Sequence, residues 1–306
     1  MQETTSDRNN VVAFQIVGGL GNQYFQYATG RAIALHHKAK LVLDTSWYDH
    51  ISAGDTRRDM QLKNLRVNVA RFTNVSQEPL EDLHPNVLQN VMRSIARKRP
   101  LKHSEKKNFA YDPSIIDMYM KRNEKHYFTG YWQSYRYFDS IRSHLVNELQ
   151  PVSALTQDYA RYIESIQSSE AVMVHVRHGD YLSHLSYHYV LNIEYYLAAM
   201  KRIHNQSPNA HFFVFSDDIA WCQKHFPKEY KITFIISSND PDANIQEIFL
   251  MSHCKHYIIA NSSFSWWGAW LRRRLDGLVF APQRWIADAK LNLDDLLPPD
   301  WQRLPA

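Results

Sequence analysis

The chain has 306 residues and a formal net charge of +4, and 44% of its residues are hydrophobic against 22% charged. This length favours two domains over one, and so small a charge argues against a protein that binds nucleic acid through many phosphate contacts. No stretch approaches the roughly 20 apolar residues that a membrane-spanning helix needs, so we expect a soluble protein.

Cysteine spacing and the N-terminal residues indicate the compartment. Cys222 and Cys254 lie in unrelated segments without metal-ligand or CxxC spacing, which favours a reducing compartment over a disulfide framework. The first residues, MQETTSDRNN, are polar and lack the apolar region of a signal peptide. We therefore expect a cytoplasmic protein.

The first half begins with a pattern of Rossmann type. Residues 13–17 form an apolar strand, GGLGNQ (18–23) follows, a helix is expected from about Asn22, and residues 40–43 form a second strand. Backbone N–H groups between a glycine turn and a helix favour an anion, although a plain tight turn explains so short a motif equally well.

The segment from Trp47 to Glu124 has no clear periodicity. Its basic stretch RSIARKRPLKHSEKK (93–107) is interpreted first as a solvated surface or loop. The alternative is contact with an anionic acceptor or with the inner face of a membrane.

The second half alternates strands with helices. Apolar strands are expected at 171–176, 211–215, 232–236, 257–260 and 277–281, with helical patterns between several of them. This alternation predicts a parallel sheet, in which ligands bind beyond the carboxyl ends of the strands. We place the domain boundary between residues 155 and 156, giving domains 1–155 and 156–306.

Three polar motifs follow these strands. HVRHGD (175–180) reads as a nucleotide-phosphate clamp or as a histidine nucleophile. In FSDD (215–218), a carboxylate could accept hydrogen bonds from a purine or ribose or could cap the next helix, and the sequence does not say which aspartate does which. NSSFSWWGAWL (261–271) places hydroxyls at a helix start, as in a phosphate nest, while its tryptophans favour the core.

A metal site has little support. The sixteen histidines form no HExxH motif or Cys/His cluster, and Asp240-Pro-Asp242 is best interpreted as a turn.

Taken together, these motifs resemble the α-1,2-fucosyltransferases of glycosyltransferase family 11, in their bacterial form. The matching stretches occur in the family's order and span most of the chain: GGLGNQYFQYATGRAIA, GYWQSYRYF, HVRHGDYL, FSDD and LMSHCKHYIIANSSFSWWGAWL.

The resemblance implies an α/β, GT-B-like fold of two Rossmann-like domains facing each other across a cleft. It also implies GDP-fucose as donor, no cofactor or required metal, inversion at the fucose anomeric carbon, and transfer to the 2-hydroxyl of a terminal β-galactose. The N-terminal domain is expected to hold the acceptor and the C-terminal domain the donor.

Carried over by position, Arg177 is the expected catalytic residue, placed on the donor pyrophosphate. We expect the acceptor to contact aromatic side chains of the first half, among Trp47, Tyr48, Tyr131 and Trp132, with Trp47 and Trp132 as the assigned residues; core packing explains these aromatics equally well. The expected donor-binding residues are Gly21, Asn22, His175, Arg177, Asp217, Asp218, Asn261, Ser262, Ser263 and Phe264. A general base stays unassigned among Asp44, Asp55, Asp59 and His36.

The chain departs from the family pattern at two positions. The family usually reads His-x-Arg-Arg-x-Asp, and here His178 stands at the second arginine position. The family often has asparagine where this chain has Tyr257. If the second arginine supplies charge to the donor site, this chain binds donor more weakly or uses His178 instead; if that arginine is structural, the replacement changes little.

Three rival interpretations remain. Arg177-His-Gly179 matches the signature of histidine phosphatases, although it lies far from the first strand, where that signature belongs. The second is a non-catalytic binder of nucleotides or glycans on the same fold. The third keeps the fold and changes the donor sugar or the linkage.

Overall fold

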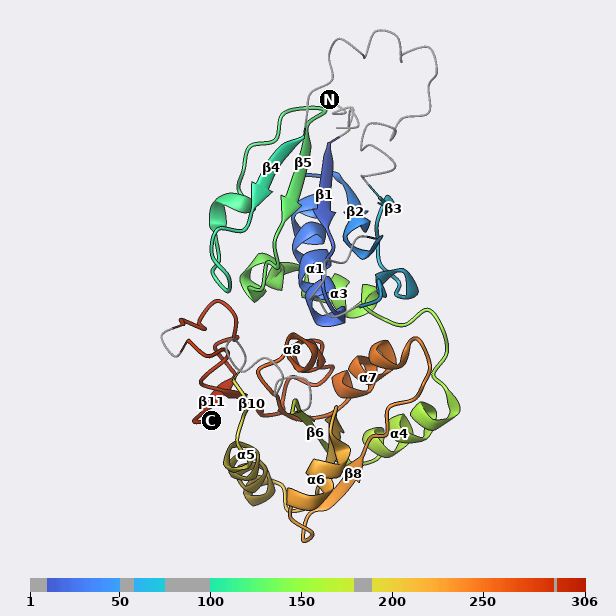
Figure 1. Ribbon diagram of the computed structural model, residues 1–306, viewed down its shortest axis with the longest axis vertical. Helices are drawn as coiled ribbons and strands as arrows, with labels where there is room; N and C mark the ends of the chain where they lie inside the picture. The colour runs from blue at the N-terminus through green and yellow to red at the C-terminus, as the bar shows by residue number, and fades with distance from the viewer. Residues whose placement is uncertain (1–9, 50–57, 75–99, 179–188, 289–290) are drawn as a thin grey trace, which may run out of the picture. The chain divides into compact units, whose positions relative to one another are not determined.

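The computed structural model describes the chain in five stretches, which form two compact units (Figure 1). Unit 1 comprises residues 1–63 and 67–148, and unit 2 comprises residues 64–66 and 149–306. Each unit holds one sheet with parallel strands. The described stretches are 10–49, 58–74, 100–178, 189–288 and 291–306.

Unit 1 is built on a five-stranded sheet in the order β3-β2-β1-β5-β4. Short 3-10 helices connect several of its elements, at Ser46–Asp49, Leu62–Asn64, Pro113–Ile115, Tyr135–Tyr137 and Asp139–Ile141. Its strands and α-helices are β1 (Val11–Gln15), α1 (Leu20–His36), β2 (Lys40–Asp44), β3 (Arg71–Thr73), β4 (Leu101–Ser104), β5 (Lys125–Thr129) and α3 (Arg142–Glu148).

The predicted strand, glycine turn, helix and strand at the start of the chain are confirmed, with β1 two residues earlier than expected. Strand β1 is central and its residues 11–14 are buried, as expected for a strand covered on both faces. Gly30 lets α1 approach this strand closely, because a Cβ there would lie 2.9 Å from the ring of Phe14.

Unit 2 is built on a six-stranded sheet in the order β11-β10-β9-β6-β7-β8. Its strands are β6 (Glu170–Val176), β7 (Ala210–Ser216), β8 (Lys231–Phe234), β9 (His256–Ile258), β10 (Val279–Pro282) and β11 (Gln302–Leu304). Its helices are α4 (Gln157–Gln167), α5 (Ile193–Gln206), α6 (Ile219–His225), α7 (Ala243–Ser252) and α8 (Ser263–Trp270).

The five strands predicted in this half are all present, and their bounds differ by at most two residues. Helix α5 packs on the sheet through Tyr196, Ala199, Met200 and Ile203. Of the apolar face that the sequence predicts, Ile193, Tyr196, Leu197 and Met200, the structure buries Tyr196 and Met200 and leaves the other two half-buried. The turn expected at Asp240–Asp242 is also present, since the Asp240 carboxylate accepts a hydrogen bond from the Asp242 N–H.

The structure corrects the interpretation of the basic stretch 93–107 as a plain surface or loop. Residues 93–99 lie outside the described residues, but 101–104 form β4, an edge strand paired with β5. Its side chains are largely exposed, and Leu101 is 50% exposed. An edge strand this short, with one face in solvent, leaves no apolar alternation to detect.

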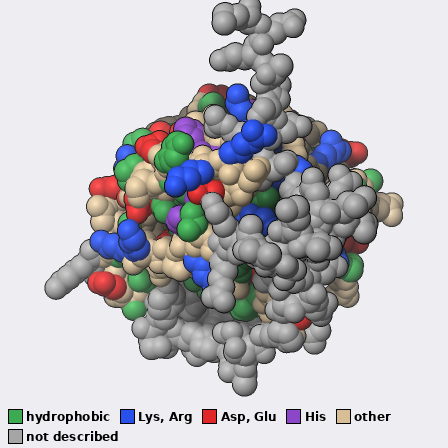
Figure 2. Space-filling view, turned by 90° about the horizontal axis from the view of Figure 1, so that it is seen from above, with side chains coloured by type: hydrophobic (Ala, Val, Ile, Leu, Met, Phe, Trp, Pro, Cys, Tyr) green, Lys and Arg blue, Asp and Glu red, His purple; other side chains and the backbone are tan. Residues whose placement is uncertain are grey.

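Charged side chains of both signs are interspersed on the face shown in Figure 2, in line with the small net charge. Within the described part of the chain, no helix is long and apolar enough to cross a membrane.

Candidate functional site

The glycine turn of unit 1 connects β1 to α1 at the carboxyl edge of the sheet. Gly18 has φ +77°, a left-handed conformation that glycine adopts without steric cost, and Gly19 is the residue before the first turn of α1. The Tyr48 hydroxyl and the Gln23 side-chain amide both donate hydrogen bonds to the Gly18 carbonyl, at 2.9 and 3.1 Å. The turn is therefore held from two sides, and buried Gly21 follows it in the helix.

Asn22 is fixed by the GYWQ segment that follows β5. The Gln133 amide donates to the Asn22 side-chain oxygen at 2.8 Å. One turn further along α1, Gln26 accepts from the Val17 N–H and donates to the Gly130 carbonyl. Two motifs more than 100 residues apart thus meet at one edge of the sheet through three amide side chains, Asn22, Gln26 and Gln133, of which the sequence singled out only Asn22.

The two predicted acceptor residues have different environments. Trp47 is half-buried in a 3-10 helix, with its ring 4.9 Å from that of Tyr48. Trp132 is only 1% exposed, and its ring packs edge-on against Phe14 and Phe128. Its indole is a core side chain here, as the packing alternative supposed, so we leave Trp132 out of the acceptor site proposed below.

The four candidates for a general base lie in different environments. Asp44 is fully buried and accepts hydrogen bonds from Ser46 and from the Tyr127 hydroxyl, so its carboxylate is occupied inside the sheet. His36 lies in the last turn of α1, at the opposite edge from the glycine turn. Asp59 is exposed, and Asp55 lies outside the described residues. Nothing here selects one of them.

In unit 2, the motifs HVRHGD and FSDD meet because β6 and β7 are parallel neighbours with Val176 opposite Ser216. The Arg177 Nε lies 3.4 Å from an Asp217 carboxylate oxygen. The next residues pair in the same way, since His178 Nδ1 donates to an Asp218 oxygen at 3.1 Å. Gly179 and Asp180, the rest of the first motif, lie outside the described residues.

Asp218 is also the N-cap of α6, because its other oxygen accepts the Trp221 N–H at 2.9 Å. The capping role that the sequence offered to one of the two aspartates therefore belongs to Asp218, whose carboxylate is engaged at both oxygens. Asp217 accepts from the His178 N–H at 2.9 Å in addition to its contact with Arg177. Both aspartates thus hold the segment that carries Arg177.

His175 is the one histidine of β6 and is 3% exposed. Burial, with the neighbouring Arg177 guanidinium as the second cause, lowers the pKa of His175 to about 3, so the ring is neutral at pH 7. Its Nδ1 has no hydrogen-bond partner among the described residues. The ring lies 5.6 Å from the ring of Phe264, which joins the end of β6 to the start of α8.

Because His175 is buried in its neutral form, acid should destabilise the fold. The unfolded chain takes up a proton below a pH of about 6.5 while folded His175 does not, so this contribution to stability is complete above that pH and is lost as the pH falls towards 3. At pH 5 the loss from this one residue is about 2 kcal/mol. Urea unfolding measured by tryptophan fluorescence from pH 7.5 to 5 tests this expected loss of stability.

The matched variant for that experiment is His175→Gln, which keeps a neutral polar side chain without an imidazole. Its free energy of unfolding should depend less on pH than that of the wild type. At pH 5 the difference between the two slopes should correspond to about one bound proton. His211, whose pKa burial lowers to about 4, adds a slope of the same sign in both proteins. Equal slopes for the two proteins between pH 6.5 and 5 would contradict the assignment.

The motif NSSFSWWGAWL begins just after β9 and contains the whole of α8. Ser262 is the N-cap of α8, and its hydroxyl accepts the Phe264 N–H at 3.3 Å. Asn261 is 3% exposed and donates to the carbonyls of Tyr189 and Trp285. Ser263 is half-buried in the first turn. The Trp266, Trp267 and Trp270 rings are buried, as predicted.

The motifs HVRHGD, FSDD and NSSFSWWGAWL lie together because the strands that precede them, β6, β7 and β9, are consecutive in the sheet. Parallel strands end at the same edge, so the polar segments after these three strands share it. The geometry brings together Arg177, Asp217, the start of α8 and the His175 ring. The sequence missed Trp221, whose ring stacks on His178 at 4.6 Å, because one tryptophan in a short helix reads as core packing.

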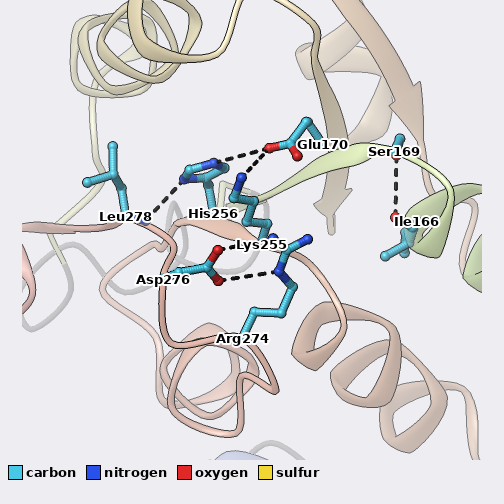
Figure 3. Close-up of polar contacts among 8 residues, drawn as sticks. All are labelled: Ile166, Ser169, Glu170, Lys255, His256, Arg274, Asp276 and Leu278. Carbon is cyan, nitrogen blue, oxygen red and sulfur yellow. Dashed lines mark hydrogen bonds and ion pairs between the residues drawn. The ribbon is translucent and has the colours of Figure 1, made fainter.

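A second group of charged residues lies at the opposite, amino edge of this sheet (Figure 3). Lys255, just before β9, pairs with Glu170 at the start of β6 at 2.6 Å, and His256 Nδ1 accepts the Leu278 N–H. Arg274 pairs with Asp276. Tyr257, where the family often has asparagine, is buried and donates to the Cys254 carbonyl at 2.5 Å. These contacts brace the sheet away from the polar edge.

Comparison with known proteins agrees with this geometry. A family model described as glycosyl transferase family 11 matches residues 2–304. An alpha-1,2-colitosyltransferase of Escherichia coli is 32% identical and aligns with 96% of this chain and 99% of its own length. The O-antigen biosynthesis glycosyltransferase WbnK of Escherichia coli is also 32% identical, over 90% of this chain and 96% of its own.

Among solved structures, POFUT1 in complex with GDP superposes with a TM-score of 0.52 at 14% identity, covering 88% of this chain and 96% of that one. The fold is therefore α/β and GT-B-like, and the protein is a glycosyltransferase. With a family model matching nearly its whole length, the chain belongs to glycosyltransferase family 11. This membership overturns the histidine-phosphatase interpretation of Arg177-His178.

Proposed function

We propose that this enzyme transfers L-fucose from GDP-fucose to the 2-hydroxyl of a terminal β-galactose, forming an α-1,2 linkage with inversion at the anomeric carbon. The observation that carries the proposal is the position of Arg177, which follows the central strand β6 and is held by Asp217 at the carboxyl edge of the sheet. Ligands of parallel sheets bind at this edge.

The names of related proteins support the donor and the linkage. Besides the colitosyltransferase, the relatives include galactoside 2-alpha-L-fucosyltransferases, such as Sec1 of Mus musculus, 26% identical over 47% of this chain, and Galactoside alpha-(1,2)-fucosyltransferase 2 of Pongo pygmaeus, 20% identical over 87%. The names of both this orang-utan enzyme and the colitosyltransferase specify an alpha-1,2 linkage.

The chemistry proposed for Arg177 follows from the charge that transfer creates. When the bond from the anomeric carbon to the pyrophosphate breaks, negative charge develops on the departing GDP, and donors already in place stabilise that charge most. A guanidinium suits this role because its planar fork makes two charge-assisted hydrogen bonds to phosphate oxygens and keeps its proton. The N–H groups in the first turn of α8, at the positive end of the helix dipole, would add to it.

The remaining assignments are proposals of the same kind. Gly21 and Asn22 of unit 1 are proposed donor contacts, and so are His175, Asn261, Ser262, Ser263 and Phe264 of unit 2. For Asp217 and Asp218, support of the Arg177 segment replaces guanine recognition as the role we favour. The first half, predicted as domain 1–155, is proposed to hold the acceptor, with Trp47 as an aromatic contact, and domain 156–306 to hold the donor.

The direct test is transfer itself. The protein is incubated with GDP-fucose and a panel of β-galactosides, and NMR locates the new glycosidic bond. We expect an α-linked fucose on the galactose 2-hydroxyl of at least one acceptor. A parallel incubation with the GDP-activated colitose donor, which the 32% identical colitosyltransferase suggests, decides between the two sugars. Binding of GDP-fucose without transfer to any galactoside of the panel would contradict the proposed acceptor.

A further inference from the structure

Unit 1 contains a pocket of about 180 Å³ formed by the segments that follow β4 and β5. Its walls include residues 104–107 and 110–112 and the side chains of Trp132 and Tyr137. Strands β5 and β4 lie on one side of β1 in the sheet, and β2, which precedes Trp47, lies on the other. The pocket is therefore separate from the acceptor contact proposed at Trp47.

Glu105 leaves a hydrogen-bond acceptor unpaired at the wall of this pocket. Its Oε2 accepts the Tyr131 N–H at 2.8 Å, whereas its Oε1 is buried and has no partner among the described residues. Burial raises the pKa of this carboxyl, against the opposite effect of the backbone N–H groups of residues 131–133. A buried oxygen without a partner is costly, so we expect a ligand hydroxyl or a water molecule to complete it.

Trp132 leaves a hydrogen-bond donor unpaired at the same pocket. Its side chain is 1% exposed, and its indole N–H has no partner within the described part of the chain. A buried indole N–H usually has one. The ring packs against Phe14 and Phe128 in the core, so the N–H, rather than a ring face, is what Trp132 can offer to a ligand.

One unpaired donor and one unpaired acceptor fit a neutral ligand with hydroxyl groups, because a hydroxyl both donates and accepts. An anion would meet the Glu105 carboxyl, and a cation would meet Lys106 and Lys107 at the wall. The Tyr111 and Tyr137 rings, 4.9 Å apart, supply apolar surface. The volume is below the roughly 300 to 1,000 Å³ of pockets for drug-sized ligands, so it suits a single ring.

We propose that this pocket binds one neutral pyranose ring, with one sugar hydroxyl donating to Glu105 Oε1 and another accepting from the Trp132 indole N–H. The protein is a glycosyltransferase, so sugars are the hydroxyl-bearing rings of its substrates and products. The bound ring is a sugar other than the reacting galactose, either a further unit of the acceptor glycan or the fucose of a product. The inference depends on membership of the family and not on the donor or the linkage.

The indole N–H signal of Trp132 in the ¹⁵N-labelled protein tests the proposal. The probes are the methyl glycosides of galactose, glucose and fucose, with methylammonium chloride as a cation for comparison. A hydrogen bond to a sugar hydroxyl should move this signal downfield, with a dissociation constant on the order of 1 mM for one ring. A response to the fucoside alone indicates a product sugar, and a response to the other two indicates an acceptor unit.

Three variants locate the bound sugar, and saturation-transfer NMR on the sugar measures the affinity of each. Trp132→Phe keeps an aromatic ring in the core but loses the N–H, so it should bind about fivefold more weakly. Its spectrum also assigns the Trp132 signal. Ala110→Leu enlarges a side chain at the wall and should abolish binding. The matched control is Trp301→Phe, which removes another buried, unpartnered indole N–H of the described residues, in unit 2, and should bind like the wild type.

The variants are compared after thermal scans have shown that they are folded. A Trp132 signal that responds to none of the glycosides contradicts the proposal and leaves water as the occupant of the pocket. A response to methylammonium in place of the sugars contradicts a neutral ligand. Equal affinity in Ala110→Leu and the wild type would place the sugar elsewhere and also contradict it. These outcomes leave the proposed transfer from GDP-fucose standing, and failure of that transfer leaves the pocket assignment standing.

Discussion

Replacing Arg177 by alanine is expected to lower the rate of transfer by about 100-fold to 1000-fold, the usual effect of removing one preorganised donor from a developing anion. The protein should stay folded, because the Arg177 side chain lies at the edge of the sheet, 23% exposed, rather than in the core. Initial rates with saturating acceptor, together with circular dichroism spectra of both proteins, measure the two parts of this expectation.

Arg274 provides the matched control for Arg177. It belongs to the same unit and also pairs with an aspartate, but it lies at the opposite edge of the sheet (Figure 3). Arg274→Ala should keep the wild-type rate to within about a factor of two, as for a surface ion pair of small energy. If Arg177→Ala keeps a tenth or more of the wild-type rate, the assignment of Arg177 to the leaving diphosphate is wrong.

Replacing Gly130 by alanine is expected to destabilise unit 1 by about 4 kcal/mol, from backbone strain and overpacking together. Gly130 has φ +132°, and an added Cβ would lie 2.5 Å from the Cβ of Glu105. That atom cannot move without β4, and burial already raises the pKa of the Glu105 carboxyl, which accepts the Tyr131 N–H. A thermal scan should show an unfolding temperature lower by roughly 10 °C.

This substitution should also weaken donor binding, because the chain after Gly130 carries Gln133, the partner of Asn22. Gly19→Ser is the control on the other side of the same edge. Among the described residues, a Cβ at Gly19 meets only the Arg58 side chain, at 3.9 Å, and serine is a favoured N-cap residue. Its unfolding temperature should stay close to that of the wild type, whereas a Gly130→Ala protein as stable as wild type would contradict the strain argument.

The alternation of apolar strands and helices made the sheet of unit 2 predictable, because each buried parallel strand is a short continuous apolar run. The same rule placed Arg177 correctly, as the first polar residue after such a run. In unit 1, β3 and β4 have three and four residues and half-exposed faces, so neither a run nor an alternation marks them. The prediction missed these two strands because their faces are half-exposed and leave no burial pattern in the sequence.

The partners within the site were not predictable in the same way. That Asp217 meets Arg177 and Asp218 meets His178 depends on the register of β6 against β7, and register is a property of two strands rather than of either one. Aromatic residues posed a different difficulty. Trp132 fills the core and Trp221 lies beside the candidate site, yet both are large aromatic side chains in short polar segments.

The tryptophans of α8 have a consequence for how a ligand is received. Trp266 donates its indole N–H to the Leu296 carbonyl and, with Trp267 and Trp270, fixes the helix in the core of unit 2. The amide groups at the start of that helix are thus immobilised when the chain folds, before the nucleotide of the proposed donor binds. Association then demands little additional ordering of backbone in this region, and most of the favourable enthalpy of those contacts survives as affinity.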